Sequence, residues 1–471
     1  MNTRKLSRIT AVALGLALAT TMAAAQALNS GAQTIALNAT LAESLTLSLS
    51  ANAVNFTLAA GQAANAGSVP ITATTTWTLK PGRTTVGVYA YFTTTTALTD
   101  GAGNNIPSSA FFVADNAAPS TALTANTPWT TGTGLQMANV AINGLGRIGR
   151  AALKILMEAD GLDLVAVNDI VDADNLAYLI KYDTVYGRYQ SEVTHADGAL
   201  IVDGKRIPAL AERDPANLPW GDLRVDLVLE CSGVFTTAEA LAKHVQAGAS
   251  YVILSAPTKS DTVPTVVHGV NRPNSRPQII SCASCTTNCI APVIEVAHRR
   301  LGVERAVMTT VHAYTAGQRL VDGPSRSFRR GRAGAANLVP TSTGAAQATT
   351  RAVPELVGRF DGLAVRAPIP VGSVADIVFV ASRATTGEEV NEAFRQEAGT
   401  ARYEGILGIS EDPLVSADII GDPRAAVVDL ELTMVVDGTL VKVMAWYDNE
   451  WGFTHQMIRE ARSILGVPDT S

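Results

Sequence analysis

The chain has 471 residues, of which 47% are hydrophobic and 17% are charged, and its formal net charge is −6. This length allows roughly two to four domains with a sizeable buried core, and the mildly acidic balance gives no reason to expect a nucleic acid as a partner. The averages conceal a break, because residues 1–136 carry only eight formal charges and no cysteine, whereas all four cysteines lie beyond them. We therefore interpret the sequence as two unlike parts joined end to end.

The first 25 residues are typical of an export signal. Three basic residues within the first eight precede a mostly apolar stretch over residues 9–22, and three alanines at 23–25 fit a small-residue cleavage site. The stretch is too short to span a bilayer comfortably, so no permanent membrane anchor is expected. We predict a signal peptide here; the alternative is an alanine-rich helix without a targeting role.

Residues 26–136 are rich in Thr, Ala, Asn, Ser and Gly and contain short runs with a period of two, most regularly at residues 44–50. Such strands, broken by Gly, Pro and Asn turns, predict a small all-β module resembling an antiparallel β-sandwich. The segment has no His and no Cys, and we find no catalytic constellation in it. We interpret it as a secreted structural or adhesive module.

A nucleotide-binding fingerprint begins after Met137. An apolar strand at residues 140–143 is followed by Gly144, Gly146 and Gly149 in the pattern G-x-G-x-x-G, and then by an apolar helical segment at residues 151–159. Glycines between a strand and a helix permit a tight turn and a close approach of the backbone to a pyrophosphate, which binds at the helix N-terminus.

Asp169 ends the next apolar strand, twenty residues beyond Gly149. A carboxylate at this position can accept hydrogen bonds from the adenosine ribose and repels a 2′-phosphate, so the sequence predicts NAD rather than NADP. The alternative is an acid that only caps a loop. Further apolar strands at residues 225–230 and 251–255 extend the βα alternation of a parallel sheet.

Three cysteines, Cys282, Cys285 and Cys289, precede a helical pattern that extends to Leu301. A cysteine near a helix N-terminus feels its positive end, which favours the thiolate. Pro292 leaves two alternatives: the helix is kinked there, or its regular part begins nearer Pro292 and the effect weakens.

His312 is the best positional candidate for a base that activates a cysteine. It ends an apolar, β-like run at residues 306–311, and a side chain at a strand end can project into a cleft. The other five histidines have no comparable setting. Spacing alone leaves the pairing of Cys285 with His312 open.

Five motifs then occur in one order: A-I-N-G-L-G-R-I-G-R at 141–150, S-C-T-T-N-C at 284–289, T-V-H-A-Y-T at 310–315, S-T-G-A-A at 342–346, and W-Y-D-N-E-W-G at 446–452. On these motifs, the chain from Met137 to about Val467 resembles the family of phosphorylating glyceraldehyde-3-phosphate dehydrogenases. The resemblance implies an α/β fold with a Rossmann-type NAD-binding domain at 137–285, an α+β catalytic domain at 286–449, and a C-terminal helix at 450–471 that returns to the NAD-binding domain.

The resemblance also implies an activity, the NAD-dependent oxidation of glyceraldehyde 3-phosphate to 1,3-bisphosphoglycerate in glycolysis. Cys285 matches the nucleophile that forms a hemithioacetal and then a thioester, which inorganic phosphate cleaves, and His312 matches the acid/base. The matches to substrate-binding residues are Ser284, Thr286, Thr315, Thr343, Gly344 and Arg366, with Thr315 and Arg366 on the phosphate of the substrate. The matches to cofactor-binding residues are Gly144, Gly146, Arg147, Ile148, Gly149, Asp169, Arg213, Ser255 and Asn449, the last at the nicotinamide carboxamide.

The resemblance further implies a homotetramer in which the loop at residues 318–340 lies at a subunit interface, and it implies no metal. Gly317 departs from the family, which usually carries Asp there, so the substrate-phosphate subsite is altered and erythrose-4-phosphate dehydrogenase remains an alternative. Cys282 and Cys285 also form a C-x-x-C, which can indicate a functional disulfide.

NAD, phosphate and a free thiolate are cytosolic resources, so the dehydrogenase part is expected in the cytoplasm, whereas a working signal at residues 1–25 would direct export. Three explanations compete: a true fusion, a gene model that joins two neighbouring genes, or a secreted surface protein that reuses the dehydrogenase fold. The last makes an exported binding protein with a non-catalytic dehydrogenase-like domain the second alternative function.

Overall fold

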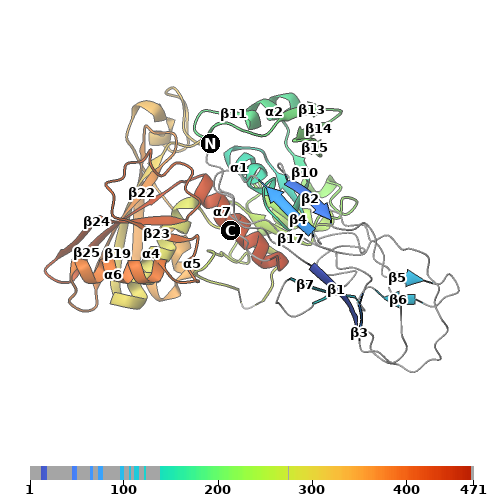
Figure 1. Cartoon of the computed structure of the whole chain (residues 1–471). Coiled ribbons are helices and arrows are strands. Elements are labelled where there is room, and N and C mark those ends of the chain that lie inside the picture. The colour runs from blue at the N-terminus through green and yellow to red at the C-terminus, as the bar shows by residue number, and fades with distance from the viewer. Residues whose placement is uncertain are drawn as a thin grey trace. The chain divides into compact units, whose positions relative to one another are not determined.

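The computed structural model describes residues 138–467, apart from residue 274, and in the N-terminal part only the backbone of eight short strands (Figure 1). The chain is divided into two compact units, Met1–Met137 and Ala138–Ser471. None of the helices in the described residues combines the length and the apolar character needed to cross a membrane.

The N-terminal strands pair antiparallel, in one four-stranded sheet of order β3-β1-β7-β8 and two ribbons, β2-β4 and β5-β6. They are β1 (Val12–Ala17), β2 (Leu45–Leu49), β3 (Ala64–Ala66), β4 (Ala73–Trp77), β5 (Thr96–Thr99), β6 (Asn105–Pro107), β7 (Phe111–Asp115) and β8 (Thr121–Leu123). Strand β2 coincides with the predicted alternation at residues 44–50. The predicted signal peptide lies outside the described residues except for β1, and the sandwich-like module stays a prediction.

An eight-stranded sheet of order β13-β14-β15-β10-β9-β16-β17-β18 forms the first half of the second unit. Its strands are β9 (Ala138–Asn143), β10 (Leu162–Asn168), β13 (Val193–Ala196), β14 (Ala199–Val202), β15 (Lys205–Leu210), β16 (Leu227–Glu230), β17 (Tyr251–Leu254) and β18 (Ile279–Ser281). From β15 to β18 all neighbours are parallel. If these six strands are numbered in chain order, their order in the sheet is 3-2-1-4-5-6, which is the arrangement of a dinucleotide-binding fold. The ligand of such a fold lies where the strand order reverses, beyond the ends of β9 and β16.

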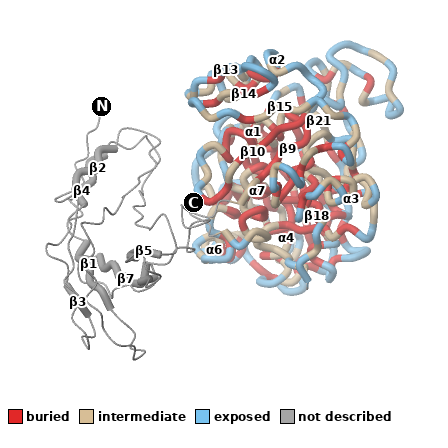
Figure 2. The backbone as a smooth tube through the Cα atoms, turned by 90° about the vertical axis from the view of Figure 1, so that its right-hand side faces the viewer, coloured by how far each residue is buried: buried red, intermediate tan, exposed pale blue. Residues whose placement is uncertain are grey.

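Helices α1 (Arg147–Leu156), α2 (Ala173–Lys181) and α3 (Ala238–Gln246) connect these strands, and a two-stranded hairpin, β11 (Tyr182–Asp183) and β12 (Gly187–Arg188), follows α2. The C-terminal helix α7 (Trp451–Leu465) packs beside α1 (Figure 1). Its buried residues Phe453, Met457 and Ala461 belong to the hydrophobic core of the NAD-binding sheet. Figure 2 shows buried backbone concentrated in the central strands and exposed backbone at the periphery of the described part.

A seven-stranded mixed sheet of order β20-β21-β19-β22-β25-β24-β23 forms the second half. Its strands are β19 (Val303–Ala313), β20 (Val339–Ser342), β21 (Phe360–Ala367), β22 (Ser373–Ala381), β23 (Leu407–Ser410), β24 (Ala426–Val436) and β25 (Leu440–Tyr447), and helices α4 (Cys285–Leu301), α5 (Ala345–Ala352) and α6 (Gly387–Ala398) pack on one face. Short 3₁₀ helices lie at Pro215–Asn217, Phe328–Gly331, Gly334–Ala336 and Pro354–Leu356.

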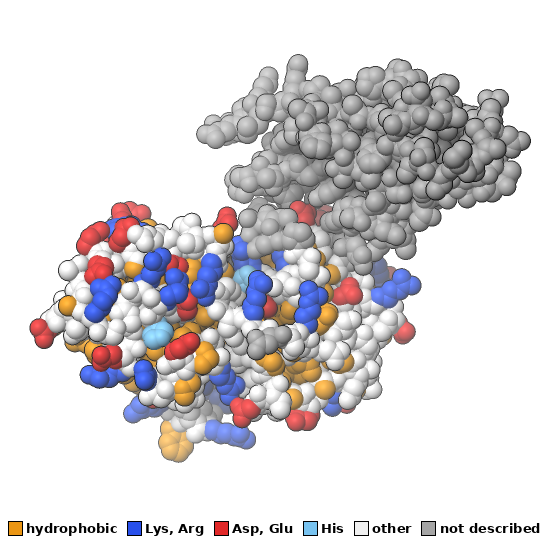
Figure 3. Space-filling view, turned by 90° about the horizontal axis from the view of Figure 1, so that it is seen from below, with side chains coloured by type: hydrophobic (Ala, Val, Ile, Leu, Met, Phe, Trp, Pro, Cys, Tyr) orange, Lys and Arg blue, Asp and Glu red, His pale blue; other side chains and the backbone are white. Residues whose placement is uncertain are grey.

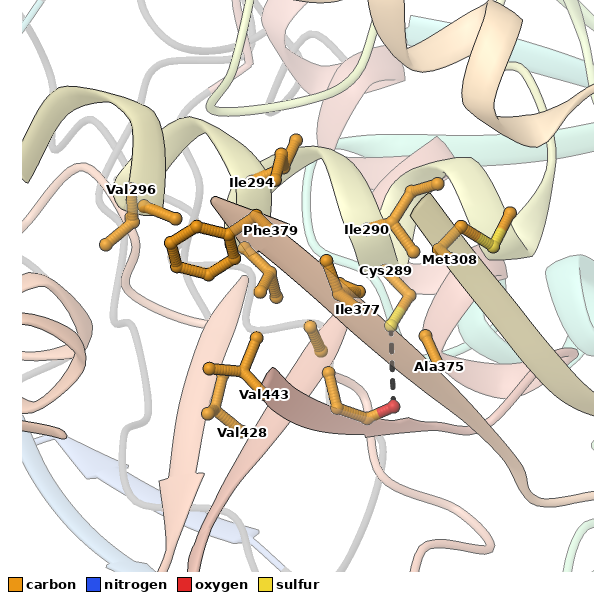
Figure 4. Packing of buried hydrophobic residues seen from close by; sticks show 14 of the residues in the cluster. Cys289, Ile290, Ile294, Val296, Met308, Ala375, Ile377, Phe379, Val428 and Val443 are labelled. Carbon is orange, nitrogen blue, oxygen red and sulfur yellow. Dashed lines mark hydrogen bonds between the residues drawn. The ribbon is translucent and has the colours of Figure 1, made fainter. Parts of the chain in front are cut away.

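Helix α4 is anchored to this sheet by a close-packed apolar core (Figure 4). Ile290 and Ile294 on the helix face Ile377 and Phe379 on the sheet, and Cys289 lies among them with its thiol directed to the carbonyl oxygen of Ala445 at 3.8 Å. Packing of this density holds side chains in fixed positions. The start of α4 is therefore fixed relative to the end of β19.

Acidic and basic side chains are mixed on the face of the molecule drawn in Figure 3, and hydrophobic side chains reach the surface between them. No tract of a single charge sign dominates that face within the described residues.

Candidate active site

The glycine-rich loop between β9 and α1 lies where the strand order of the sheet reverses. At two of its glycines there is no room for a side chain. Gly144 has a φ of +94°, and a Cβ there would lie 2.5 Å from the backbone of Ser232; a Cβ on Gly149 would lie 1.9 Å from the carbonyl oxygen of Gly144. Gly146, in contrast, is exposed and has open space around its Cβ position. A tight turn, an open backbone approach and close helix-to-strand packing are the three roles that glycines have in dinucleotide binding.

Helix α1 begins directly after Gly146, and no side chain caps its N-terminus. The first amides of α1, those of Arg147 and Ile148, are therefore donors suited to an anion such as pyrophosphate. Because the loop and this helix start fit a dinucleotide, these residues would hold NAD through their backbone.

Asp169 lies beside the same loop, where its carboxylate accepts from the backbone N–H of Leu145 at 2.7 Å and of Val171 at 3.0 Å. Asp169 thus does cap backbone N–H groups of two loops, the role considered as the alternative. These bonds hold its carboxylate next to the glycine-rich loop, where the strand order reverses. Ser255 follows β17 and donates its backbone N–H to Glu230 at 3.0 Å, and Arg213 is exposed beyond β15.

Asn449 reaches the site from the other half of the molecule. Its side chain is 5% exposed, and Oδ1 accepts from the backbone N–H of Gly372 at 3.2 Å and from the hydroxyl of Ser373 at 2.9 Å. The two bonds fix the orientation of the amide.

The side chain of Arg147 makes protein contacts. Nε and Nη2 donate to Glu450 at 2.9 and 2.5 Å, and Nη1 donates to Asp183 at 2.6 Å. The guanidinium of Arg147 is therefore occupied by two carboxylates, and its backbone N–H is the part left for the expected cofactor contact.

Cys285 and His312 are brought together as the sequence suggested. Sγ of Cys285 lies 3.3 Å from Nε2 of His312, which is at the end of β19 and 3% exposed. Helix α4 begins at Cys285, with Ser284 as its N-cap and Pro292 inside it. Of the two alternatives raised by Pro292, the later helix start is wrong, so the positive end of the helix does act on the thiol.

Burial controls the charge state of both groups. It raises the pKa of the Cys285 thiol, an effect that nearby Arg366 and the backbone N–H of Thr286 oppose. Burial, and after it the charge of Arg366, lowers the pKa of His312 to about 3. Each group is therefore neutral at rest, and transfer of the thiol proton creates two charges in contact that stabilise each other.

Arg366 lies at the edge of the imidazole. It is aligned with His312 across the parallel pair of β21 and β19, and its Nη1 contacts Nδ1 of His312 at 2.5 Å and donates to the carbonyl oxygen of Ala313 at 3.0 Å. Nδ1 also lies 2.7 Å from the same carbonyl oxygen. The guanidinium can donate to Nδ1 only in the tautomer with the proton on Nε2, whereas in the tautomer with the proton on Nδ1 both nitrogens donate to the carbonyl of Ala313 and Nε2 keeps its lone pair. That tautomer is the one able to accept the thiol proton.

Tyr447 is a site residue that sequence reasoning did not single out. Its buried hydroxyl bonds the hydroxyls of Thr286 at 2.9 Å and Thr310 at 2.8 Å, and its ring packs edge-on against His312. The hydroxyl of Thr286 is thus oriented by Tyr447, and both this hydroxyl and the backbone N–H of Thr286 lower the pKa of the Cys285 thiol.

A second helix begins at the site. Gly344 precedes α5, and the hydroxyl of Thr343 accepts from the N–H of Ala345 at 3.2 Å. Arg330 lies close enough to Arg366 for its positive charge to lower the pKa of Arg366. Its guanidinium donates to the hydroxyl of Thr341 and to the carbonyl oxygen of Ser342. Sequence reasoning missed Arg330, because it is one of five arginines in the loop at residues 318–340 and no local pattern distinguishes it.

Thr315 and Gly317 are exposed beyond the end of β19. The backbone N–H of Thr315 donates to Gln318 at 3.3 Å, and a Cβ on Gly317 would meet only the hydroxyl of Thr315, at 3.8 Å. Space for a side chain is therefore present at Gly317 and is unused.

All four cysteines are free thiols, and Cys282 is buried below the site. The structure thus contains no Cys282–Cys285 disulfide. Within the described residues there is no group of His, Cys, Asp or Glu that could hold a metal ion.

Comparisons with known proteins match the second unit. Residues 138–238 match the family described as glyceraldehyde 3-phosphate dehydrogenase, NAD binding domain, and residues 284–449 match its C-terminal domain. One similar protein is the glyceraldehyde-3-phosphate dehydrogenase of Streptomyces coelicolor. It is 47% identical over 323 residues, which cover 68% of this chain and 96% of that protein. That of Zymomonas mobilis is 47% identical over 69% of this chain and 98% of that protein, and that of Geobacillus stearothermophilus is 47% identical over 69% and 97%.

Proposed function

This chain belongs to the glyceraldehyde-3-phosphate dehydrogenase family, and from that premise we propose which of its residues oxidise glyceraldehyde 3-phosphate with NAD and inorganic phosphate. The observation that carries the proposal is the pair of Cys285 and His312, 3.3 Å apart at the N-terminus of α4 and beside Arg366. A thiol, a base and a cation around one point are what acyl transfer from an anionic aldehyde requires.

The first step is attack of Sγ of Cys285 on the aldehyde carbon. The thiol proton passes to Nε2 of His312 as the C–S bond forms, and His312 then protonates the former carbonyl oxygen to give a hemithioacetal. The backbone N–H of Cys285 and the imidazole stabilise the negative charge that develops on this oxygen. Arg366 and Thr315 hold the phosphate of the substrate.

The chemistry that NAD supplies when bound is acceptance of a hydride, which converts the hemithioacetal on Cys285 into a thioester. His312 removes the hydroxyl proton in that step. Inorganic phosphate then attacks the thioester carbon, the C–S bond breaks, and His312 returns a proton to the sulfur. We assign the attacking phosphate to the start of α5, with Thr343 and Gly344, and to the guanidinium of Arg330; the helix N-terminus and the nearby positive charge support this assignment.

NAD is expected on the glycine-rich loop, at Asp169, Arg213 and Ser255, and at Asn449 for the carboxamide of the nicotinamide. The open backbone at Gly146 and the uncapped start of α1 support this placement. Asp169 favours NAD over NADP because a carboxylate repels a 2′-phosphate.

The test is formation of NADH by the purified full chain. With glyceraldehyde 3-phosphate, NAD and phosphate we expect sustained turnover, and without phosphate a single turnover that leaves an acyl group on the enzyme. Absence of NADH with phosphate present would contradict the proposal and favour the non-catalytic alternative. Erythrose 4-phosphate in the same assay tests the other alternative, which none of the relatives named above supports.

We further propose a homotetramer. Val307 and Val311 on β19, Leu363 on β21 and Met434 on β24 are 36% to 61% exposed, on the face of the seven-stranded sheet opposite α4. The loop at residues 318–340 adds a second apolar surface, in which Phe328 is 90% exposed. Apolar surface of this extent typically marks an interface, and two separate surfaces suit the two isologous interfaces of a tetramer.

The substitution Val307→Lys should lower the molar mass of the particle measured by light scattering, because a charge would have to be buried between two sheet faces. The matched control is Val357→Lys, which makes the same change at a side chain of similar exposure, 65%, on the connection between the 3₁₀ helix Pro354–Leu356 and β21 rather than on a strand of the sheet. An unchanged mass in Val307→Lys would contradict the sheet-face interface.

We propose that the dehydrogenase acts in the cytoplasm, since its mechanism needs a free thiol together with NAD and phosphate. The free state of all four cysteines supports this location. The N-terminal sequence of the protein in its native host tests it. A chain beginning at Gln26 would show that the predicted signal is cleaved, which contradicts this location.

A further inference from the structure

The guanidinium of Arg147 joins two acidic groups that are far apart in the sequence. Its two carboxylate partners, Asp183 and Glu450, have side chains that are 5% and 13% exposed, and the side chain of Arg147 is 30% exposed, so both ion pairs are partly shielded from solvent. Glu450 receives bonds from both Nε and Nη2 of Arg147, and such forked pairing fixes direction as well as distance. Residue 450 is therefore tied to the start of α1.

Asp448, like Glu450, is bonded to the NAD-binding half of the second unit. Asp448 is 1% exposed. Its carboxylate accepts from the hydroxyl of Tyr186 at 2.9 Å, from the N–H of Gly421 at 2.8 Å, and from the N–H groups of Glu450 and Trp451, both at 2.8 Å. Tyr186 belongs to the segment between β11 and β12. Asp183 accepts from its backbone N–H at 3.1 Å, and the Arg147 guanidinium lies over its ring.

Asn449 lies between these two anchored carboxylates. Its Oδ1 is held from the opposite side by Gly372 and Ser373 at the start of β22. The backbone before and after Asn449 is thus fixed to the NAD-binding half, while its amide is fixed to the catalytic half. A displacement of residues 448–450 would turn the amide.

We propose that Arg147, Asp183, Glu450, Asp448 and Tyr186 form a clamp that positions Asn449 toward the nicotinamide. This rests on the proposed function, because it takes Asn449 as the residue that binds the carboxamide. The five are positioning residues. The guanidinium of Arg147 then contributes to nicotinamide binding without touching the cofactor, whereas its backbone N–H serves the pyrophosphate.

ADP-ribose separates these two roles, since it keeps the adenosine, the pyrophosphate and both riboses of NAD but lacks the nicotinamide. In Glu450→Gln the charge that holds Arg147 is lost with little change of shape. We expect the affinity for NAD, measured by calorimetry on the full chain, to fall about tenfold while the affinity for ADP-ribose stays within about twofold of wild type. Asn449→Ala should show the same selective loss, and combining it with Glu450→Gln should add little, because both changes act on one amide.

Tyr186→Phe provides a second variant should Glu450→Gln fold poorly, since it removes one hydroxyl and should cause a smaller selective loss of NAD affinity. The control is Glu389→Gln on α6, which breaks an exposed ion pair with Arg383 and should change neither affinity. Equal losses for NAD and ADP-ribose would overturn the clamp, because they place the guanidinium at the pyrophosphate, and so would unchanged affinity for both. Failure of the wild type to bind either ligand would instead refute the proposed function.

Discussion

Replacing Cys285 with serine should reduce the rate of NADH formation by about 10⁶-fold, the scale seen when a covalent nucleophile is removed. A hydroxyl in the same place is a far weaker nucleophile, and an ester does not retain the acyl-transfer potential that phosphate needs to form an acyl phosphate. The position itself would be preserved, because Ser284 still caps α4 and the apolar core still holds the helix.

Two measurements make the result specific. Intact-mass spectrometry of the wild type with aldehyde and NAD, but without phosphate, should show one acyl group per chain, and Cys285→Ser should show none. Cys289→Ser is the matched control, because it makes the same atomic change one turn further along α4, where the thiol lies in the apolar core and donates to the carbonyl oxygen of Ala445. Comparable loss of activity in both variants would mean that damage to the helix, rather than removal of the nucleophile, explains the effect.

Sequence alone predicts the parts of this site that are local in the chain. The glycine-rich turn between β9 and α1 is encoded within a few residues, because a positive φ at Gly144 and the contact between Gly149 and Gly144 depend on neighbours in the chain. The strand that ends just before Asp169 and the strand that carries His312 follow from apolar runs. The pairing of Cys285 with His312 was left open by spacing and is decided by the packing of α4 on the sheet.

The remaining parts of the site depend on contacts that local pattern does not encode. Arg147 pairs with Glu450, 303 positions away in the chain, and no feature of the local sequence distinguishes this partly buried arginine from one on the surface. The sequence around Tyr447 predicts only an apolar strand. The role of its hydroxyl, which bonds Thr286 and Thr310, depends on residues that are distant in the chain. The antiparallel strands β13 and β14, which extend the NAD-binding sheet, are short enough that their period is ambiguous.

His312→Asn should slow formation of the thioester at pH 7 by about 10²- to 10⁴-fold, the usual contribution of a positioned base. The pH dependence should also change. Because the pKa of His312 is lowered to about 3, the imidazole is unprotonated throughout the range from pH 5 to pH 8, and the wild-type rate should be nearly flat there. The variant must rely on thiol that has already ionised, and burial raises the pKa of that thiol, so its rate should rise about tenfold for each unit of pH.

The rate of the single turnover in the absence of phosphate measures this step directly. His195→Asn is the control, since His195 is exposed on β13 and its loss should leave both the rate and its pH dependence unchanged. A wild-type rate that itself rises tenfold per unit across this range would show that the thiolate forms before substrate attack without help from the imidazole. Parallel profiles for wild type and His312→Asn would likewise remove His312 from the role of base, because a base lost by mutation cannot leave the slope unchanged.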